Sequence, residues 1–456
     1  MDLLGWMRRS AWGPGIHPDD HKAQTSGKAI RRMPFPPRLV VPLGQHVGRP
    51  SRPMVRVGQP VQRGERIAEA DGFVSVAQHA PATGVIEAIE LQPLPRGGVG
   101  QAIVIRVCQG DSQEAVGNPL DIDALGRDEL LGQIQQSGIV GLGGAAFPTH
   151  VKLSVKPEQK VDTLLVNGCE CEPYLTCDHR TMLESTDDLV RGIRIALRIT
   201  GAARAIIGIE DNKPDAVVRL REVTQGDRNI TVRAVPSFYP QGAEKILVQT
   251  LLRREVPSGG LITDVGATMQ NVGTLAQLGR LLPRGETLTE RVVTVAGSGM
   301  ERPGNYIIPI GTPVGFVLQQ VGFAGRSSRL VLGGPMMGQA VAALTVPIVK
   351  GSSGLLAIDA EAVTEQPRRT YPCIRCGECV RACPLHLNPK ELGLLAANRE
   401  YRLMAERFHL NDCFECGCCA LVCPAAIPLV QHFRVAKAVN RRALARATQR
   451  RGEPVR

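Results

Sequence analysis

Residues Cys373–Pro384 read CIRCGECVRACP, four cysteines spaced C-x2-C-x2-C-x3-C and followed by a proline. The same spacing returns at Cys413–Pro424, which read CFECGCCALVCP. Three thiolates this close together can wrap one face of an iron–sulfur cube. Zinc sites also use C-x2-C pairs, but a third cysteine and then x3-C-P is not the usual zinc pattern. The two runs therefore predict two 4Fe–4S clusters.

The fourth cysteine of such a run usually ligates the cluster held by the other run. The crossed arrangement predicts a first cluster on Cys373, Cys376, Cys379 and Cys423. It predicts a second cluster on Cys413, Cys416, Cys419 and Cys383. Between the runs, Asn388–Ala397 and Tyr401–Phe408 have helical periodicity. We therefore expect a largely helical two-cluster domain and not a compact, strand-paired one.

The remaining cysteines give weaker signals. Cys169, Cys171 and Cys177 are spaced C-x-C-x5-C and lack a fourth local ligand. We expect free thiols there, and a third metal site is the alternative. Cys418 disturbs neither run and is interpreted as a spare residue beside a cluster. Disulfides are not expected, because the cytosol keeps thiols reduced.

Composition and length set the broad class. The chain has 456 residues, 43% hydrophobic and 21% charged, which suffices for several folded domains and excludes a largely disordered protein. No apolar stretch approaches the ~18 residues of a transmembrane helix, and the first residues do not form the hydrophobic region of a signal peptide. We therefore expect a soluble, cytoplasmic chain.

The net charge of +11 allows a nucleic-acid, membrane or acidic protein partner. Nucleic acid is disfavoured, because no aromatic cluster is interleaved with the basic residues. Much of the excess lies in residues 434–456, which hold eight Lys or Arg against one acid. We interpret this segment as a solvated helix that frays into a basic tail. Docking onto anionic lipid headgroups or an acidic partner is the alternative.

A glycine-rich turn occupies the middle of the chain. Residues Ser137–Leu153 read SGIVGLGGAAFPTHVKL, a turn that runs into a helix. Such turns let backbone N–H groups approach a phosphate, and the positive end of the helix adds attraction. Taken alone, the pattern is more typical of an ordinary connection between a strand and a helix, because glycine turns are common there.

The residues that follow strengthen the phosphate interpretation. Thr163–Asn167 is a short apolar strand, and Glu170 and Glu172 follow its end. Next come a helix over 185–201 and a second apolar strand, Ala203–Glu210. This is a βαβ unit with a phosphate-type turn, a lysine, an asparagine and paired carboxylates. It favours a nucleotide or flavin site.

These stretches resemble the flavoprotein subunit of respiratory complex I, whose pattern is G-x-G-G-A-G-F-P-T-x-x-K followed by N-x-x-E-x-E-P. With the two cysteine runs added, the chain is similar to the RnfC family, the peripheral iron–sulfur and flavin subunits of Rnf (Rsx) electron transport complexes. Further shared stretches are Gly15–Pro18, Gly208–Pro214, Met269–Thr274, Gly333–Gly338 and Ile427–Phe433. The resemblance covers nearly the whole chain.

The resemblance implies the residues of an FMN site. These are Gly141, Gly143, Gly144, Lys152, Asn167, Glu170, Glu244 and Asn271. It further implies that Glu172 and Phe147 face a nicotinamide nucleotide, NADH, as catalytic residues. Two positions depart from the complex I pattern. Ala146 replaces a glycine, and Cys169 stands where that pattern has an aspartate.

The resemblance also implies a multidomain α/β architecture. The expected order is a barrel-sandwich (lipoyl-like) domain with an N-terminal arm (1–120), an FMN-binding α/β domain (121–288), a β-grasp, SLBB-like module (289–358), a helical dicluster 4Fe–4S domain (359–433) and a basic tail (434–456). A covalent swinging arm on the barrel is excluded, because no lysine occurs between Lys28 and Lys152.

The implied function is that of an NADH-linked oxidoreductase subunit of an ion-translocating complex. Electrons would pass between NAD(H) and ferredoxin-type carriers through FMN and the two clusters. The expected partners are the other subunits of a membrane-embedded complex, and the expected location is the cytoplasmic face of the bacterial inner membrane, peripherally and through those partners. No nucleic-acid partner is expected. The alternatives are a non-catalytic iron–sulfur relay or adaptor without a working flavin site, and a cobalamin-reductase-type relative.

Overall fold

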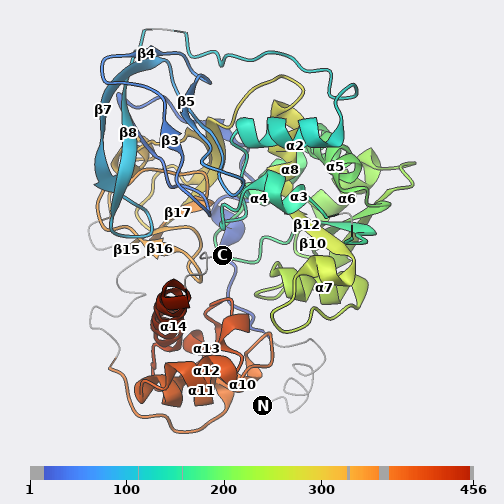
Figure 1. Cartoon of the computed structure of the whole chain (residues 1–456), viewed down its shortest axis with the longest axis vertical. Coiled ribbons are helices and arrows are strands. Elements are labelled where there is room, and N and C mark those ends of the chain that lie inside the picture. The colour runs from blue at the N-terminus through green and yellow to red at the C-terminus, as the bar shows by residue number, and fades with distance from the viewer. Residues whose placement is uncertain (1–14, 111, 157, 326–328, 359–368, 452–456) are drawn as a thin grey trace.

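The computed structural model describes residues 15–110, 112–156, 158–325, 329–358 and 369–451. Figure 1 shows a barrel module (residues 38–107) and a parallel-sheet module (127–281) side by side, with a mixed-sheet module (290–358) between and behind them. A helical cluster module (369–451) lies below all three. The multidomain α/β architecture expected from the sequence is therefore confirmed.

The barrel module consists of two antiparallel sheets. The larger has the order β2 (Arg38–Pro42), β8 (Val99–Val107), β7 (Gly84–Pro93) and β4 (Pro60–Val61), and the smaller has β3 (Arg52–Pro53), β5 (Arg66–Glu69) and β6 (Gln78–His79). Inward side chains such as Leu39, Ile67 and Ile103 form one core between the sheets. This is the barrel-sandwich domain that the resemblance implies.

The parallel-sheet module contains four parallel strands in the order β11 (Ile230–Val235), β10 (Arg204–Glu210), β9 (Thr163–Gly168) and β12 (Ala267–Asn271). Its helices are α2 (Arg127–Gln136), α3 (Thr149–Leu153), α4 (Cys177–Glu184), α5 (Thr186–Thr200), α6 (Pro214–Val223), α7 (Glu244–Leu252) and α8 (Val272–Leu281). Successive β9 residues enter two different cores, Leu164 on one face and Leu165 on the other. Both faces are therefore covered, as is usual for parallel sheets.

Helix α5 agrees closely with the sequence-based prediction. It follows Ser185 and ends at Gly201, which has φ +71°. Its central Gly192 lies against α8, where a Cβ would meet the carbonyl oxygen of Leu275 at 1.9 Å. Only glycine allows the two helices to approach so closely. The predicted βαβ unit is thus confirmed, with β9 and β10 parallel.

The order of the parallel strands creates a switch point. β9 is the first of the four in the chain, β10 and β11 follow on one side of it, and β12 is added on the other side. In open parallel sheets, ligands bind outside the carboxyl ends of the strands where the order reverses. The carboxyl ends of β9 and β12 form this position.

The mixed-sheet module has six strands around helix α9 (Val314–Gln320). Their order is β1 (Arg31–Arg32), β14 (Gly304–Pro309), β13 (Glu290–Gly297), β17 (Gly354–Ile358), β15 (Arg329–Leu332) and β16 (Gln339–Ala340). The edge strand β1 comes from the N-terminal arm, which also carries the short helix η1 (Lys22–Gln24). The arm therefore reaches across to the third module of the chain.

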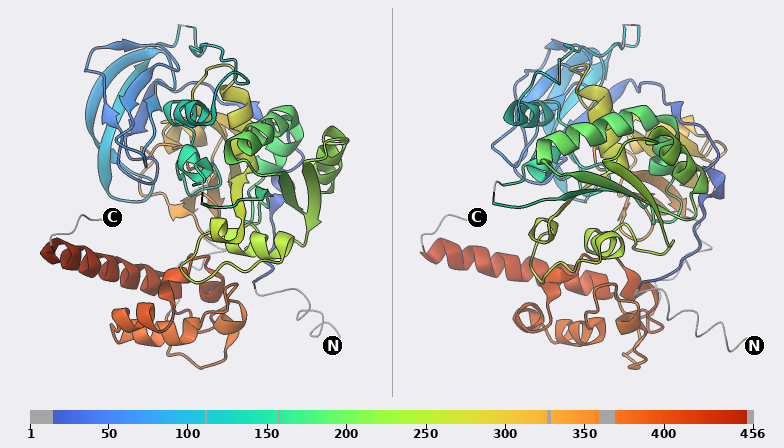
Figure 2. Two further views of the ribbon diagram at one scale, coloured as in Figure 1. Left: turned by 45° about the vertical axis from the view of Figure 1, so that its right-hand side comes forward. Right: turned by 90° about the vertical axis from the view of Figure 1, so that its right-hand side faces the viewer.

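The cluster module is helical, as predicted, and residues 369–451 contain no strand. Its helices are α10 (Glu378–Arg381), α11 (Pro389–Ala397), α12 (Tyr401–Glu406), η3 (Leu410–Asp412), α13 (Cys418–Leu421) and α14 (Leu429–Arg451). Helix α14 extends away from the module (Figure 2). The predicted boundary between residues 433 and 434 lies inside α14. Phe433 and Ala436, on either side of this boundary, are both buried in the core of the cluster module.

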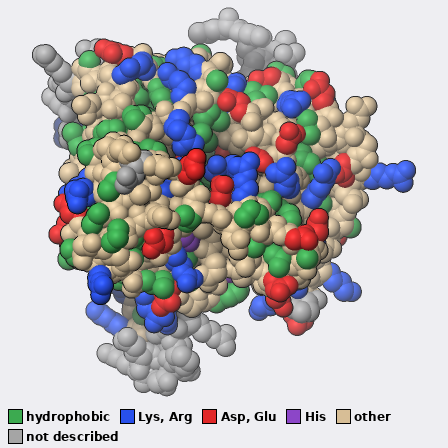
Figure 3. All heavy atoms as spheres, turned by 90° about the horizontal axis from the view of Figure 1, so that it is seen from above, with side chains coloured by type: hydrophobic (Ala, Val, Ile, Leu, Met, Phe, Trp, Pro, Cys, Tyr) green, Lys and Arg blue, Asp and Glu red, His purple; other side chains and the backbone are tan. Residues whose placement is uncertain are grey.

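On the face of the molecule shown in Figure 3, the basic side chains are not concentrated in one patch. Lys and Arg side chains are interspersed there with Asp and Glu. Within the part of the chain that the structure describes, no helix is both long enough and apolar enough to cross a lipid bilayer.

Candidate functional site

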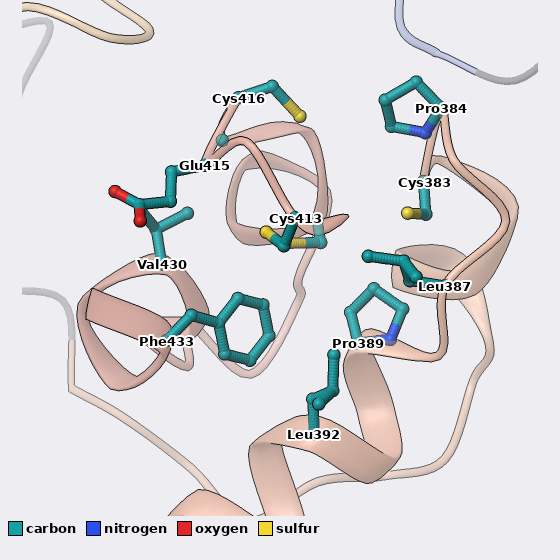
Figure 4. Close-up of a pocket in the computed structure, with 12 residues that line it drawn as sticks. Cys383, Pro384, Leu387, Pro389, Leu392, Cys413, Glu415, Cys416, Val430 and Phe433 are labelled. Atoms are coloured by element: carbon teal, nitrogen blue, oxygen red, sulfur yellow. The ribbon is translucent and has the colours of Figure 1, made fainter. Parts of the chain in front are cut away.

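Four thiols of the second predicted cluster line one cavity. The cavity is bordered by Cys383 from the first run and by Cys413, Cys416 and Cys419 from the second. Figure 4 shows the labelled thiols facing a common space above the ring of Phe433. The remaining lining is mostly apolar. A space enclosed by four thiols and apolar side chains suits a 4Fe–4S cube.

The other four cysteines form a second electrostatic group. The pKa of Cys379 is raised by burial and, secondarily, by the charges of Cys423, Cys376 and Cys373. Cys423 comes from the second run, so each run contributes its last cysteine to the neighbourhood of the other. Gly377 and Gly417, with φ +81° and +89°, precede α10 and α13 and let both runs turn sharply after the second cysteine.

The two groups differ in exposure. Cys376 of the first group is exposed, whereas Cys383, Cys416 and Cys419 of the second group are buried. Cys418 is also fully buried, and its Sγ lies 4.0 Å from the carbonyl oxygen of Tyr239. The second group is therefore the more buried of the two and lies against the parallel-sheet module, whereas the first group is partly exposed.

The glycine-rich turn is held in shape by its own backbone. Gly141 donates to the carbonyl of Phe147 at 2.8 Å, and Ala146 donates back to Gly141 at 3.2 Å. The crest, residues 143–145, is exposed, and its three amides have no acceptor among the described residues. Free amides at an open turn form an anion-binding concavity. The crest therefore fits the phosphate of a flavin nucleotide.

Ala146 adopts φ +52°, a left-handed conformation. This conformation explains why the complex I pattern has a glycine at this position. The other departure, Cys169, is buried in the core beside β9, with its Sγ directed to the carbonyl of Gly208 at 3.6 Å. This contact directs the thiol toward β10 and not toward residues 143–145.

Two predicted asparagines meet at the switch point. Asn167 of β9 and Asn271 of β12 are register partners on adjacent strands. Asn271 caps α8 by accepting from Thr274 N at 3.1 Å, and a Cβ on Gly143 would lie 3.4 Å from its Cβ. Asn167 donates to the carbonyl of Gly242 at 2.8 Å. The glycine turn and both asparagines therefore occupy one edge of the sheet.

Lys152 and Glu244 are also brought together. The ammonium of Lys152 on α3 forms an ion pair with the carboxylate of Glu244 at the start of α7. Both side chains are partly exposed, so solvent screens the pair and its net contribution to stability is small. The two charges remain available to a ligand at this edge.

The predicted carboxylates Glu170 and Glu172 have structural partners. Glu170 is buried and accepts from the amides of Asp178 at 2.9 Å and His179 at 3.1 Å, which places it at the N-terminus of α4. Glu172 accepts from the amides of Met336 and Met337, both at 2.9 Å. Burial raises the pKa of Glu172, and these two amides oppose the shift.

Each oxygen of Glu172 thus already holds the turn between β15 and β16 of the mixed-sheet module. Phe147 is half-buried and uses its backbone to close the glycine turn. The nicotinamide role of these two residues remains a prediction.

The three cysteines near Glu170 do not form a compact metal site. Among the described residues, Cys177 belongs to a group of possible metal ligands with Glu170 and Asp178. The ligand atoms of these three residues lie within 4.8 Å of one another. Burial raises the thiol pKa of Cys169, of Cys177 and of Cys171, the last to about 12. They are therefore neutral thiols at physiological pH.

Sequence reasoning missed Lys22 of the N-terminal arm. Its buried ammonium donates to the carbonyls of Glu170 at 2.9 Å and Glu172 at 2.8 Å, and also to that of Leu175. Burial lowers the pKa of Lys22, and Glu170 opposes the shift. The arm thus fixes the loop that carries both carboxylates. No local motif marks this lysine, because its partners lie about 150 residues away.

Four family models match the chain in succession. Residues 11–110 match the RnfC barrel sandwich hybrid domain, and residues 134–280 match the Nuo51 FMN-binding domain. Residues 292–340 match the SLBB domain, and residues 372–427 match the 4Fe-4S dicluster domain. The order is the one that the sequence predicted.

Curated relatives cover most of the chain. A subunit of the proton-translocating ferredoxin:NAD(+) oxidoreductase complex of Clostridium ljungdahlii is 43% identical over 94% of this chain and 94% of its own length. The corresponding subunit of the Na(+)-translocating ferredoxin:NAD(+) oxidoreductase complex of Acetobacterium woodii is 38% identical over 85% and 87%. That of the ion-translocating oxidoreductase complex of Pseudomonas aeruginosa is 42% identical, and the chain spans 54% of its length. The chain therefore belongs to the RnfC family, whose members are subunits of ion-translocating oxidoreductase complexes.

Proposed function

We propose that this chain is the peripheral electron-transfer subunit of a membrane-bound complex that couples electron transfer between NAD(H) and ferredoxin-type carriers to ion translocation. The names of the relatives support the reaction and the existence of partner subunits. One structural observation carries the proposal for this chain. The sheet edge with the phosphate-type turn and the buried group of four thiols belong to modules in direct contact, through Tyr239 and Cys416.

The residues present fit the implied cofactors. The free amides of residues 143–145, with Asn167 and Asn271 beside them, would hold FMN, and Lys152 and Glu244 would border it. The crossed sets of cysteines would hold two 4Fe–4S clusters. When bound, FMN exchanges two electrons with NADH as a hydride, and each cluster carries one electron at a time.

The protein itself positions the cofactors and holds the modules that enclose them together. Lys245 of α7 pairs with Asp412 at 3.0 Å, and Asp412 also accepts from the amide of Gly259 at 3.1 Å. Burial of Asp412 acts to raise its pKa, but the bonds from Ser258, Gly259 and Lys245 outweigh burial and lower the pKa to about 2. This carboxylate is therefore charged at physiological pH and fastens the cluster module to the parallel-sheet module.

We further propose that the chain acts at the cytoplasmic face of the bacterial inner membrane, held there by the other subunits. The division into domains at residues 120, 288 and 358 is part of the same proposal, whereas α14 joins the predicted tail to the cluster module. Glu172 and Phe147 are proposed to face the nicotinamide, with Glu172 at the same time bound to the turn that contains Met336.

The test is an anaerobic titration of the purified chain with NADH. Flavin absorbance and electron paramagnetic resonance are followed together. We expect stoichiometric flavin that bleaches with NADH and clusters that become reduced afterwards. A chain with both clusters but no flavin, or with flavin that NADH does not bleach, would instead be the non-catalytic relay.

A further inference from the structure

Arg291 of β13 is a buried cation that belongs to the mixed-sheet module but contacts the glycine turn. The residue is only 3% exposed. One terminal nitrogen donates to the carbonyl of Leu142 at 3.3 Å, and the other donates to the carbonyl of Lys350. Leu142 immediately precedes the crest, residues 143–145. The guanidinium thus links the residue just before the crest to the segment around Lys350.

This cation forms no direct ion pair with a carboxylate. Within the described ranges, no Asp or Glu oxygen lies within 4.0 Å of Arg291. The preceding residue, Glu290, by contrast forms ion pairs with Arg32 at 2.6 Å, Arg63 at 2.5 Å and Arg280 at 3.6 Å. Burying an unpaired charge is costly unless a counter-charge arrives. Burial lowers the pKa of Arg291, and the neighbouring Cys177 and Asp178 oppose the shift. A phosphate at the crest would add a counter-charge to a guanidinium that no carboxylate of the described chain binds directly.

The turn is oriented so that an anion could meet this charge. The Leu142 amide donates to Thr274 Oγ1 at 2.9 Å, while its carbonyl accepts from Arg291. Both polar groups of Leu142 are thereby fixed, and the next three amides are left free at the exposed crest. A Cβ on Gly144 would meet nothing within 4 Å, so the space beside the crest is open.

We propose that Arg291 is a positioning residue that holds the glycine turn and supplies the positive charge by which the site prefers a flavin carrying a phosphate over one without it. The inference rests on the proposed FMN site and assigns part of its ligand selectivity to a different module. A phosphate dianion at the crest is attracted by the nearby buried guanidinium, because little solvent screens a buried charge. Uncharged riboflavin gains nothing from that charge.

The carboxylate of Asp178 acts against the preference for FMN over riboflavin. Asp178 accepts from Asn271 Nδ2 at 2.6 Å, and its other oxygen lies 3.0 Å from the place of a Cβ on Gly273, beside the start of α8. Burial and the neighbouring Glu170 raise the pKa of Asp178 to about 7. Above that pH its carboxylate competes with a phosphate for the same positive surroundings.

The experiment measures the affinities of FMN and riboflavin separately by anaerobic calorimetry at pH 8. It uses the full chain with its clusters in place and its flavin removed. We expect the wild type to prefer FMN. Arg291→Met should reduce the ratio of the two affinities about tenfold or more, and Arg291→Lys should keep most of it. Asp178→Asn should shift the ratio the other way, toward FMN.

Arg63→Met is the control, because Arg63 is a partly buried arginine, its side chain 12% exposed, that is paired with Glu290. The ratio of FMN affinity to riboflavin affinity in Arg63→Met should equal that of the wild type. An equal loss of both affinities in Arg291→Met, or an unchanged ratio, would overturn the inference. If that variant does not fold, Asp178→Asn decides, and an unchanged ratio there also overturns it. A wild type that binds neither flavin would refute the proposed function instead.

Discussion

The phenolic oxygen of Tyr239 donates a hydrogen bond of 2.7 Å to the carbonyl oxygen of Cys416. Tyr239 precedes α7 of the parallel-sheet module, and Cys416 belongs to the buried group of four thiols. Burial raises the pKa of Tyr239, so its hydroxyl remains a donor. The contact fixes the second predicted cluster against the module with the glycine turn. The proposed order of electron transfer depends on this arrangement.

Tyr239→Phe should loosen this junction without altering the thiols. The variant keeps the ring but leaves a buried carbonyl without its donor, which costs about 1–2 kcal/mol of the free energy of unfolding. Urea denaturation followed by circular dichroism measures the loss. Tyr371→Phe is the control, because Tyr371 is exposed and should change little. Equal effects of the two variants would contradict the role of the junction.

Serine replacements test the crossed ligand sets. Cys383→Ser should remove the same cluster as Cys416→Ser, and Cys423→Ser the same cluster as Cys376→Ser. Each variant should lose about half of the iron, because a cluster needs four thiolates. Iron analysis and electron paramagnetic resonance identify which signal disappears.

Cys108→Ser is the control for these replacements. Cys108 lies outside both groups, so its iron content should equal that of the wild type. If Cys383→Ser removed the signal that Cys376→Ser removes, each run would hold its own cluster and the crossed sets would be wrong.

Gly144 and Gly143 form a matched pair on the glycine turn. Gly144 has φ +103°, so Gly144→Ala should cost about 1–2 kcal/mol of unfolding free energy through backbone strain alone. Gly143→Ala has no positive φ, and its Cβ would meet Asn271 at an ordinary 3.4 Å. We expect it to cost less than about 0.5 kcal/mol. Denaturation of the flavin-free chain compares them, and equal costs would exclude the conformational explanation.

Lys350 predicts a dependence of stability on pH. Its buried ammonium bonds only carbonyls, those of Ala77 at 3.1 Å and Gly138 at 2.8 Å, among the groups that the structure describes. Burial lowers its pKa from 10.5 to about 7. Between these values the unfolded chain binds a proton that the folded chain does not, so the free energy of unfolding should rise with pH.

The measurement compares the wild type with Lys350→Met between pH 7 and 10. The difference between their free energies of unfolding should shift in favour of the wild type as the pH rises. The nearby buried His79 does not interfere, because its pKa lies well below 6.5 and it stays neutral throughout. A difference that is constant with pH would show that Lys350 keeps its ordinary pKa.

The sequence by itself determined the features that depend on neighbouring residues. Cysteine spacing grouped the thiols, and periodicity placed β9, α5 and β10 together with the ends of α5 at Ser185 and Gly201. Turn chemistry located the glycine-rich connection. These features are local, because backbone conformation and ligand spacing are encoded within a few turns of chain.

Only the tertiary structure decided what the charged side chains do. The resemblance implies ligand roles for Glu170 and Glu172, and the structure adds that Glu170 caps α4 and Glu172 holds a turn of another module. The buried cations Lys22 and Arg291 had no signal in the sequence, since their carbonyl partners Glu170 and Leu142 lie more than a hundred residues away. An isolated lysine or arginine is by composition a surface residue. Burial and a distant carbonyl, which only the folded chain provides, turn it into part of a site.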